Sequence, residues 1–149
     1  MSFSKFVRLQ YHSDFPFPSL SLLFAPSDYI NDGVYGAFNC ILFDHQVVHP
    51  YVLSMDGSFH VSEDEPKSLS SVWGPTCDSI DCVNTKTMLP KSLRVGDWLG
   101  FDNMGAYTVC AASRFNGFEV SKVIYTTGGP GGFEARNALA AFAAQGYGG

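Results

Sequence analysis

The stretch Trp73-Gly74-Pro75-Thr76-Cys77-Asp78-Ser79-Ile80-Asp81 places a thiol directly beside a carboxylate. Pro75 fixes its own φ and disfavours a helical conformation for the residue before it, so we expect a shaped loop around Cys77. A thiol with an ordinary pKa of about 8.5 can donate a proton near neutral pH, and a carboxylate can bind a cationic group. The pair suits half of an active site for an amine or an amino acid. A free cysteine beside solvated acids fits the same spacing, and by spacing alone is the simpler interpretation.

On both sides of this loop the chain consists of short, β-rich segments separated by Gly, Asn and Asp turns. The 13 Phe, 7 Tyr and 15 Gly, with only 15% charged residues, are typical of a β-rich domain with many turns. We expect an all-β fold, an antiparallel barrel or sandwich. The expected strands are 29–34 with a turn at 31–33, 46–53, 69–73, 98–101, 107–112 and 119–126. Residues 36–43 should form a helical turn, 115–118 a hairpin turn and 79–91 an irregular segment in which Asp81 caps a turn.

The two ends of the chain differ from this central part. Residues 1–27 are aromatic and contain three prolines, so we expect a leader that adds at most an edge strand. Residues 131–149 form a Gly/Ala-rich tail, in which 133–145 are expected to form a short C-terminal helix. A chain of 149 residues is the length of one domain, which we place at 28–130.

Composition and charge exclude several classes of function. The net charge is −5 and no basic stripe is present, so nucleic acid is not an expected partner. No apolar run is long enough to span a bilayer. Four cysteines without a C-x-x-C pair favour free thiols in a reducing compartment, and we expect a cytoplasmic protein. His45 and His49 are four residues apart, but Pro50 disfavours a helix there, so we predict no metal site.

Further stretches extend the pattern set by the Cys77 loop. In chain order they are Tyr29-Ile-Asn-Asp-Gly-Val-Tyr-Gly-Ala-Phe-Asn-Cys-Ile-Leu-Phe-Asp-His45, Val95-Gly-Asp-Trp98, Asn103-Met-Gly-Ala-Tyr-Thr108 and Phe115-Asn-Gly-Phe118. Together with residues 73–81 they resemble the C-terminal β domain of the eukaryotic-type ornithine decarboxylases, which are fold type III pyridoxal-phosphate enzymes. The resemblance covers roughly residues 28–130, about two thirds of the chain, and several long matches in order are more specific than one short motif.

The resemblance implies decarboxylation of L-ornithine to putrescine and CO₂ in polyamine biosynthesis, with pyridoxal 5′-phosphate as cofactor. It implies that Cys77 returns a proton to Cα, and that Asp78 and Asp44 hold the distal ammonium of ornithine. It also implies that the Tyr107 phenol contacts the cofactor phosphate; without the surrounding match, Tyr107 would be an ordinary half-buried tyrosine. An aspartate after the cysteine, where diaminopimelate decarboxylases have glutamate, favours a simple diamino acid, but it does not separate ornithine from lysine.

The family carries its Schiff-base lysine and its phosphate site on an N-terminal α/β barrel, and its active sites lie at a dimer interface. None of the lysines here lies in a matching motif, and Gly128-Gly-Pro-Gly-Gly132 lacks the pattern of a phosphate loop. We therefore expect a decarboxylase fragment that is inactive alone and works with a barrel domain, as a homodimer. Two alternatives stay open: a non-catalytic partner that docks on a full-length decarboxylase and modulates it, or an all-β binding module.

Overall fold

The computed structural model describes residues 5–13, 26–59 and 61–123. In these residues it shows six strands and one short α-helix, so the all-β fold is confirmed. The elements are β1 (Lys5–Ser13), β2 (Ser27–Ile30), α1 (Cys40–Phe43), β3 (Pro50–Ser54), β4 (Lys67–Trp73), β5 (Cys82–Pro90), β6 (Trp98–Phe101) and the 3₁₀ turns η1 (Val109–Ala111) and η2 (Phe115–Gly117). The predicted C-terminal helix and the Gly/Ala-rich tail lie outside the described residues.

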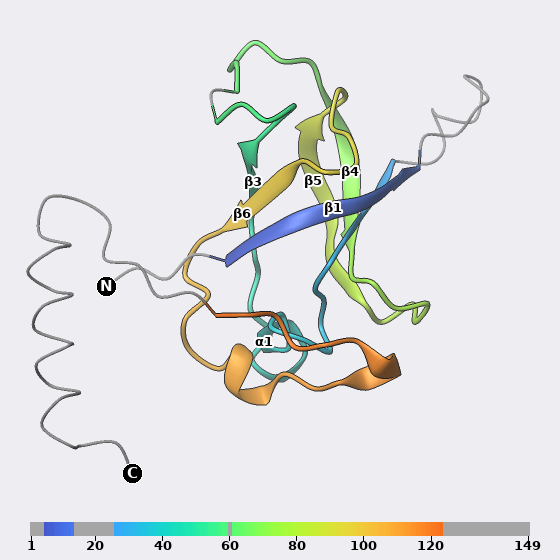
Figure 1. Cartoon of the computed structure of the whole chain (residues 1–149), viewed down its shortest axis with the longest axis vertical. Helices are drawn as coiled ribbons and strands as arrows, with labels where there is room; N and C mark the ends of the chain where they lie inside the picture. The colour runs from blue at the N-terminus through green and yellow to red at the C-terminus, as the bar shows by residue number, and fades with distance from the viewer. Residues whose placement is uncertain (1–4, 14–25, 60, 124–149) are drawn as a thin grey trace, which may run out of the picture.

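The strands form a single curled sheet in the order β3-β6-β1-β2-β4-β5 (Figure 1). Neighbouring strands are antiparallel except β2 and β4, which are parallel, so the sheet is mixed and not purely antiparallel as predicted. The curl brings its two edges together, because the Nδ2 group of Asn84 on β5 donates to the carbonyl of Val48, just before β3, at 2.9 Å. The result is a half-barrel.

Strand β1 lies in the middle of the sheet, between β2 and β6. The expectation that residues 1–27 add at most an edge strand is therefore wrong. The prolines behind that expectation all follow residue 13, so every backbone amide of β1 remains available to the ladder. Its side chains alternate as in a half-buried strand, with Val7 and Leu9 buried and Arg8 and Gln10 exposed.

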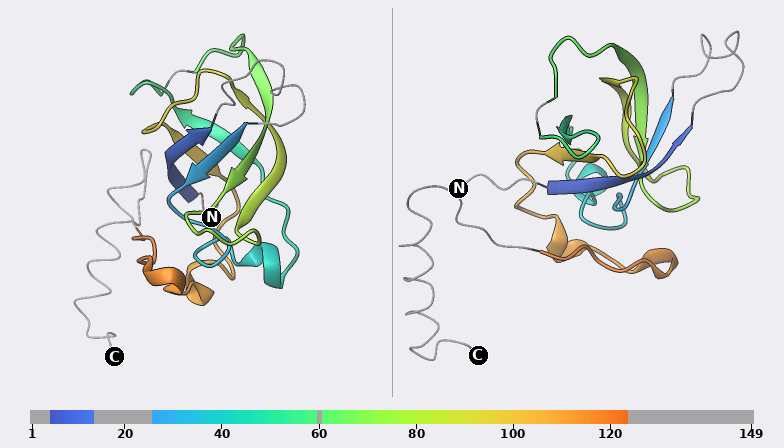
Figure 2. Two further views of the ribbon diagram at one scale, coloured as in Figure 1. Left: turned by 90° about the vertical axis from the view of Figure 1, so that its right-hand side faces the viewer. Right: turned by 45° about the horizontal axis from the view of Figure 1, so that its top comes forward.

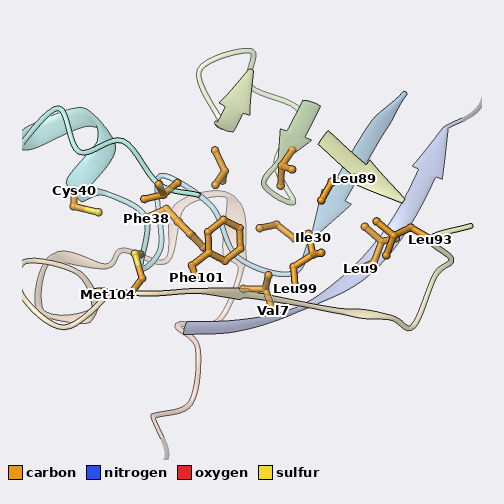
Figure 3. Packing of buried hydrophobic residues seen from close by; sticks show 13 residues of the cluster. Val7, Leu9, Ile30, Phe38, Cys40, Leu89, Leu93, Leu99, Phe101 and Met104 are labelled. Carbon is orange, nitrogen blue, oxygen red and sulfur yellow. The ribbon is translucent and has the colours of Figure 1, made fainter. Parts of the chain in front are cut away.

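The hydrophobic core lies along the curled sheet, with Cys40 of α1 at one end and Leu9 and Leu93 at the other (Figure 3). Strands β1, β2, β4, β5 and β6 contribute fully buried or nearly buried side chains, and Val52 of β3 packs against them. Phe38, just before α1, meets Phe101 of β6 edge to face, with ring centroids 4.8 Å apart and planes at 75°. This is a favourable aromatic geometry, and it holds the α1 end of the molecule to the sheet.

A buried ion pair joins the first residue of β1 to the loop that follows β2. The Lys5 Nζ atom lies 2.7 Å from Asp32 Oδ2, and only 14% and 4% of the two side chains are exposed. The other oxygen of Asp32 accepts the backbone N–H groups of Gly33 and Ala37 at 2.8 and 3.0 Å. Asp32 therefore shapes the loop after β2, and Lys5 supplies the opposite charge that its buried carboxylate needs.

The loop between β4 and β5 is closed by a second buried carboxylate. Asp81 is fully buried, and its Oδ2 atom accepts the N–H and the hydroxyl of Thr76 at 3.0 and 2.7 Å. Its Oδ1 atom accepts the N–H of Val34 at 2.9 Å, in the loop after β2. The carboxylate thus caps its own loop, as predicted, and also ties that loop to a segment almost fifty residues earlier.

Two segments differ from their predicted structure. Residues 79–91 contain strand β5, although they were expected to be irregular; β5 is an edge strand whose middle residues 85 and 86 are exposed, so no apolar alternation marks it. Residues 107–112, expected as a strand, form a turn and η1, because Tyr107 adopts a left-handed φ of 51°. The predicted hairpin at 115–118 is η2, and residues 119–123 are not a strand.

Replacing Lys5 by methionine should destabilise the fold, because it leaves the buried Asp32 carboxylate without its cation. Loss of one partner of a buried pair costs about 3–5 kcal/mol. The backbone donors that remain to Asp32 reduce the expected loss to roughly 2–3 kcal/mol. Urea unfolding measures it, with Lys86→Met on the exposed face of β5 as the matched control. Equal unfolding midpoints for the two variants would show that Lys5 does not stabilise the buried Asp32 carboxylate.

Replacing Asp81 by asparagine should also destabilise the fold. An amide has only one accepting oxygen, so either the Thr76 N–H or the Val34 N–H would face its NH₂ group. A buried donor left without an acceptor costs roughly 1–3 kcal/mol. Asp64→Asn removes the same charge from an exposed loop position and should change the thermal midpoint little. A midpoint for Asp81→Asn as high as that of this control would show that Asp81 does not hold the loop.

Candidate active site

The residues singled out from the sequence lie on three segments at the α1 end of the sheet (Figures 1 and 2). The first is the loop 31–39 between β2 and α1, continued by Asp44 at the end of that helix. The second is the loop 74–81 between β4 and β5. The third is the segment 102–123, which follows β6 and runs along the same end of the molecule.

Cys77 and Asp78 occupy the outer part of the loop 74–81. The Cys77 thiol is exposed, and Asp78 is half-buried. The loop is tight around them: the Ile80 N–H donates to Asp78 Oδ1 at 2.9 Å, and the Asp81 N–H donates to the Asp78 carbonyl at 3.0 Å. These bonds orient the Asp78 carboxylate and leave the neighbouring thiol open to an approaching molecule.

Tyr35, which the sequence analysis did not select, contacts the same carboxylate. Its phenol donates to Asp78 Oδ2 at 2.5 Å. Its ring stacks on Phe115, with centroids 4.0 Å apart and planes at 22°. No local pattern marks Tyr35, since the bond spans 43 residues; its only signal was its place inside the Tyr29–His45 stretch. The Tyr35–Asp78 hydrogen bond joins the loop 31–39 to the loop 74–81. The stack of Tyr35 on Phe115 joins both to the segment 102–123.

The hydrogen bond from Tyr35 shifts both groups that share it. It is the main cause that lowers the pKa of Asp78, with the Ile80 N–H adding to the effect and burial opposing it. It is also the main cause that raises the pKa of Tyr35, with burial and the nearby carboxylates adding to it. Asp78 is therefore anionic and Tyr35 neutral at physiological pH. A fixed anion beside an exposed thiol suits a substrate with an ammonium group.

Asp44 directly follows α1, and its N–H donates to the Cys40 carbonyl at 3.0 Å. Its side chain is exposed. Among the residues that the structure describes, no hydrogen bond joins Asp44 to Cys77 or Asp78. The carboxylate does act on Cys40, whose thiol pKa is raised first by burial and then by the charge of Asp44. Asp44 thus lies at the same end of the molecule as the Cys77 loop, but no hydrogen bond among the described residues joins the two.

Tyr107 lies on the third segment and not on a strand as predicted. Its side chain is 71% exposed, and its left-handed backbone is held by the residue that follows. The Thr108 carbonyl accepts the side-chain amide of Asn39 at 2.5 Å, and the Thr108 hydroxyl donates to the Met104 carbonyl at 3.2 Å. The phenol is therefore presented outward from an anchored turn.

The site is open and not a cavity. The pocket beside Tyr35, between Pro75 and Phe115, has a volume of about 20 Å³, room for about one water molecule. A diamino acid does not fit inside it. Within the described ranges no group of three or more His, Cys, Asp or Glu residues could hold a metal ion, and no helix is long and apolar enough to cross a membrane.

Comparison with known proteins gives this geometry a context. Residues 23–105 match the family model described as pyridoxal-dependent decarboxylase, C-terminal sheet domain. The chain is 48% identical over 105 residues to ornithine decarboxylase from Candida albicans, covering 60% of this chain and 22% of that protein. It is 52% identical over 97 residues to antizyme inhibitor 2 from Xenopus laevis, covering 65% of this chain and 20% of that protein.

Solved structures show the same architecture. The arginine decarboxylase of Paramecium bursaria Chlorella virus superposes with a TM-score of 0.69 at 29% identity, over 82% of this chain and 30% of that one. A lysine decarboxylase from Selenomonas ruminantium superposes with a TM-score of 0.68 at 26% identity, over 89% of this chain and 31% of that one. The chain spans about a fifth of the length of the curated relatives. The family match over more than half of its residues shows that the chain belongs to the pyridoxal-dependent decarboxylases, as a C-terminal sheet domain of that family.

Proposed function

We propose that this domain supplies the cysteine and aspartate half of an active site that decarboxylates L-ornithine to putrescine and CO₂. One observation carries the proposal: an exposed thiol lies next to a carboxylate that is held anionic, on a loop fixed by buried hydrogen bonds. The identity of 48% to an ornithine decarboxylase over this region supports ornithine as the substrate. The remaining half of the site, with the cofactor lysine, belongs on a barrel domain that this chain meets in a dimer.

Each side chain has a defined role in this proposal. Asp78 binds the distal ammonium of ornithine, with Asp44 as a second carboxylate at the same end of the molecule. Cys77 donates its proton to Cα after CO₂ has left, and its exposure is what this role requires. Because the Asp78 carboxylate is fixed, the distance from it to the reacting carbon is fixed as well. A diamino acid whose length matches this distance is therefore favoured.

Tyr107 is the residue of this chain that fits the family's cofactor. Its exposed phenol can donate to a phosphate oxygen without adding charge, and the Asn39 anchor keeps its backbone in place. When bound, pyridoxal phosphate supplies the electron sink for decarboxylation. The part of this chain is to hold the phosphate at Tyr107, to bind the substrate's ammonium at Asp78 and to deliver a proton from Cys77.

A second candidate function is a non-catalytic partner that docks on a decarboxylase and modulates it. Its support is the 52% identity to a protein named as an antizyme inhibitor, which is similar to the 48% identity to an ornithine decarboxylase. The sheet domain is therefore compatible with either use, and the two must be separated by assay.

Replacing Cys77 by alanine should slow decarboxylation while leaving cofactor binding intact. The test is a chimera in which residues 5–123, which include the central strand β1, replace the matching part of Candida albicans ornithine decarboxylase. Loss of a general acid lowers kcat roughly 100-fold or more, and the cofactor absorbance should persist. Cys110→Ala removes another exposed thiol and should leave the rate unchanged. If the Cys77→Ala chimera turns over like its parent, the catalytic assignment fails.

The 149-residue chain by itself should not decarboxylate ornithine, because none of its lysines matches the family's cofactor site. Mixing it with pyridoxal phosphate and carboxyl-labelled ornithine tests this by release of labelled CO₂. Release above that of a cofactor-only control would refute the expectation. Adding the chain to active Candida albicans ornithine decarboxylase separates the two candidates. A rate that changes in proportion to added chain, through a complex seen by sedimentation, favours the modulating partner.

A further inference from the structure

We propose that Tyr35 is a positioning residue for Asp78: its phenol holds that carboxylate in the orientation that receives the distal ammonium of the substrate. The proposal deepens the function given above and rests on it. It follows from the contacts that three separate segments make around one phenol.

The Asp78 carboxylate is held from both sides. Oδ2 accepts the Tyr35 hydroxyl at 2.5 Å, and Oδ1 accepts the Ile80 N–H at 2.9 Å. The two donors belong to different loops, so together they fix the rotation of the carboxylate. Each oxygen can accept one further hydrogen bond. An ammonium group therefore meets an acceptor whose direction is already set, which lowers the entropy lost on binding.

Tyr35 is itself held from behind. Its carbonyl accepts the N–H of Ser113 at 2.8 Å and the Ser113 hydroxyl at 3.0 Å. Its ring lies flat against Phe115. The segment after β6 thus clamps both the backbone and the ring, and the hydroxyl has one position from which to donate. A tyrosine that served packing alone would not need to aim its hydroxyl at a carboxylate on another loop.

The charges around Tyr35 favour the donating form of the phenol. The acidic residues Asp32, Asp81 and Glu119 line the pocket next to it. Of these, Asp81 adds to the effect of Asp78 in raising the Tyr35 pKa, while the charge of Asp32 is met by Lys5. The phenol therefore keeps its proton at physiological pH, and the bond that it donates favours the ionised form of Asp78.

The sign of the pH dependence follows from these shifts. Since the folded-state pKa of Asp78 is lowered, the bond stabilises the protein above the ordinary aspartate pKa of about 3.9. That stability is lost as the pH falls through the folded-state value. At the alkaline end it is lost as Tyr35 ionises, above the ordinary tyrosine pKa of about 10. The hydroxyl is thus effective over the whole neutral range.

The variant Tyr35→Phe separates the hydroxyl from the ring, because phenylalanine keeps the stack on Phe115. Carbon-detected NMR titration of the Asp78 carboxyl group in the full 149-residue chain is the first measurement. We expect the Asp78 pKa to rise toward its ordinary value in the variant, because the donor that is the main cause of its lowering is removed. Tyr51→Phe is the matched control, since the Tyr51 hydroxyl also lies against an aspartate, Asp102, at 3.5 Å. It should leave Asp78 unchanged.

The second measurement is steady-state kinetics in the Candida albicans chimera. With Tyr35→Phe, KM for ornithine should rise about tenfold and kcat should stay within about twofold, since the phenol acts on binding and not on the reacting carbon. Tyr51→Phe should alter neither. An unchanged Asp78 pKa, an unchanged KM, or a fall in kcat equal to the rise in KM would each overturn the proposal.

The two measurements also keep the two proposals apart. If the parent chimera has no activity, the proposed function fails, and the NMR titration alone then decides whether Tyr35 orients and ionises Asp78. If the parent chimera is active and the titration shows no shift, the function stands and the role of Tyr35 fails.

Discussion

The carboxylate of Asp81 is the constraint on which the site depends. A buried carboxylate must have its lone pairs satisfied, and here the donors come from two loops far apart in sequence. The backbone has to come close for this to happen, and it does so at glycines: a Cβ on Gly33 or Gly74 would overlap the Asp81 side chain. Once the two loops are joined in this way, Tyr35 on one lies within hydrogen-bond distance of Asp78 on the other.

This arrangement explains which parts were predictable from the sequence. The loop character of residues 74–81 follows from Pro75 and its neighbours, and the helical turn before Asp44 follows from apolar spacing; both were predicted correctly. The partners of Asp81 and Asp78 were not predictable, because they are set by contacts between distant segments and not by any local pattern. The prediction for β1 was wrong because it was drawn from the prolines of residues 1–27. All of these prolines follow the strand, which itself contains none.

Tyr107 shows the opposite case, in which local preference was overruled. Tyrosine, threonine and valine in succession favour a strand, yet the Asn39 amide captures the Thr108 carbonyl and turns the chain out of the sheet. What results is a tyrosine on an anchored turn with an outward phenol. The Cys77 loop at the same end of the molecule follows this pattern too. Its thiol faces outward, while hydrogen bonds within the domain hold the backbone of the loop. An open half-site needs such support, since no pocket walls hold its groups in place.

The central place of β1 has a consequence for how the domain forms. Arg8 of β1 pairs with Trp98 of β6, across ninety residues of intervening chain, while its other neighbour, β2, follows it closely. Contacts so distant in sequence form late, because a long loop must close first. On the ribosome, β1 and β2 emerge together, but β1 keeps one edge unpaired until nearly the whole described sheet has been synthesised. During that interval the unpaired edge of β1 is open to association with other strands, until β6 covers it.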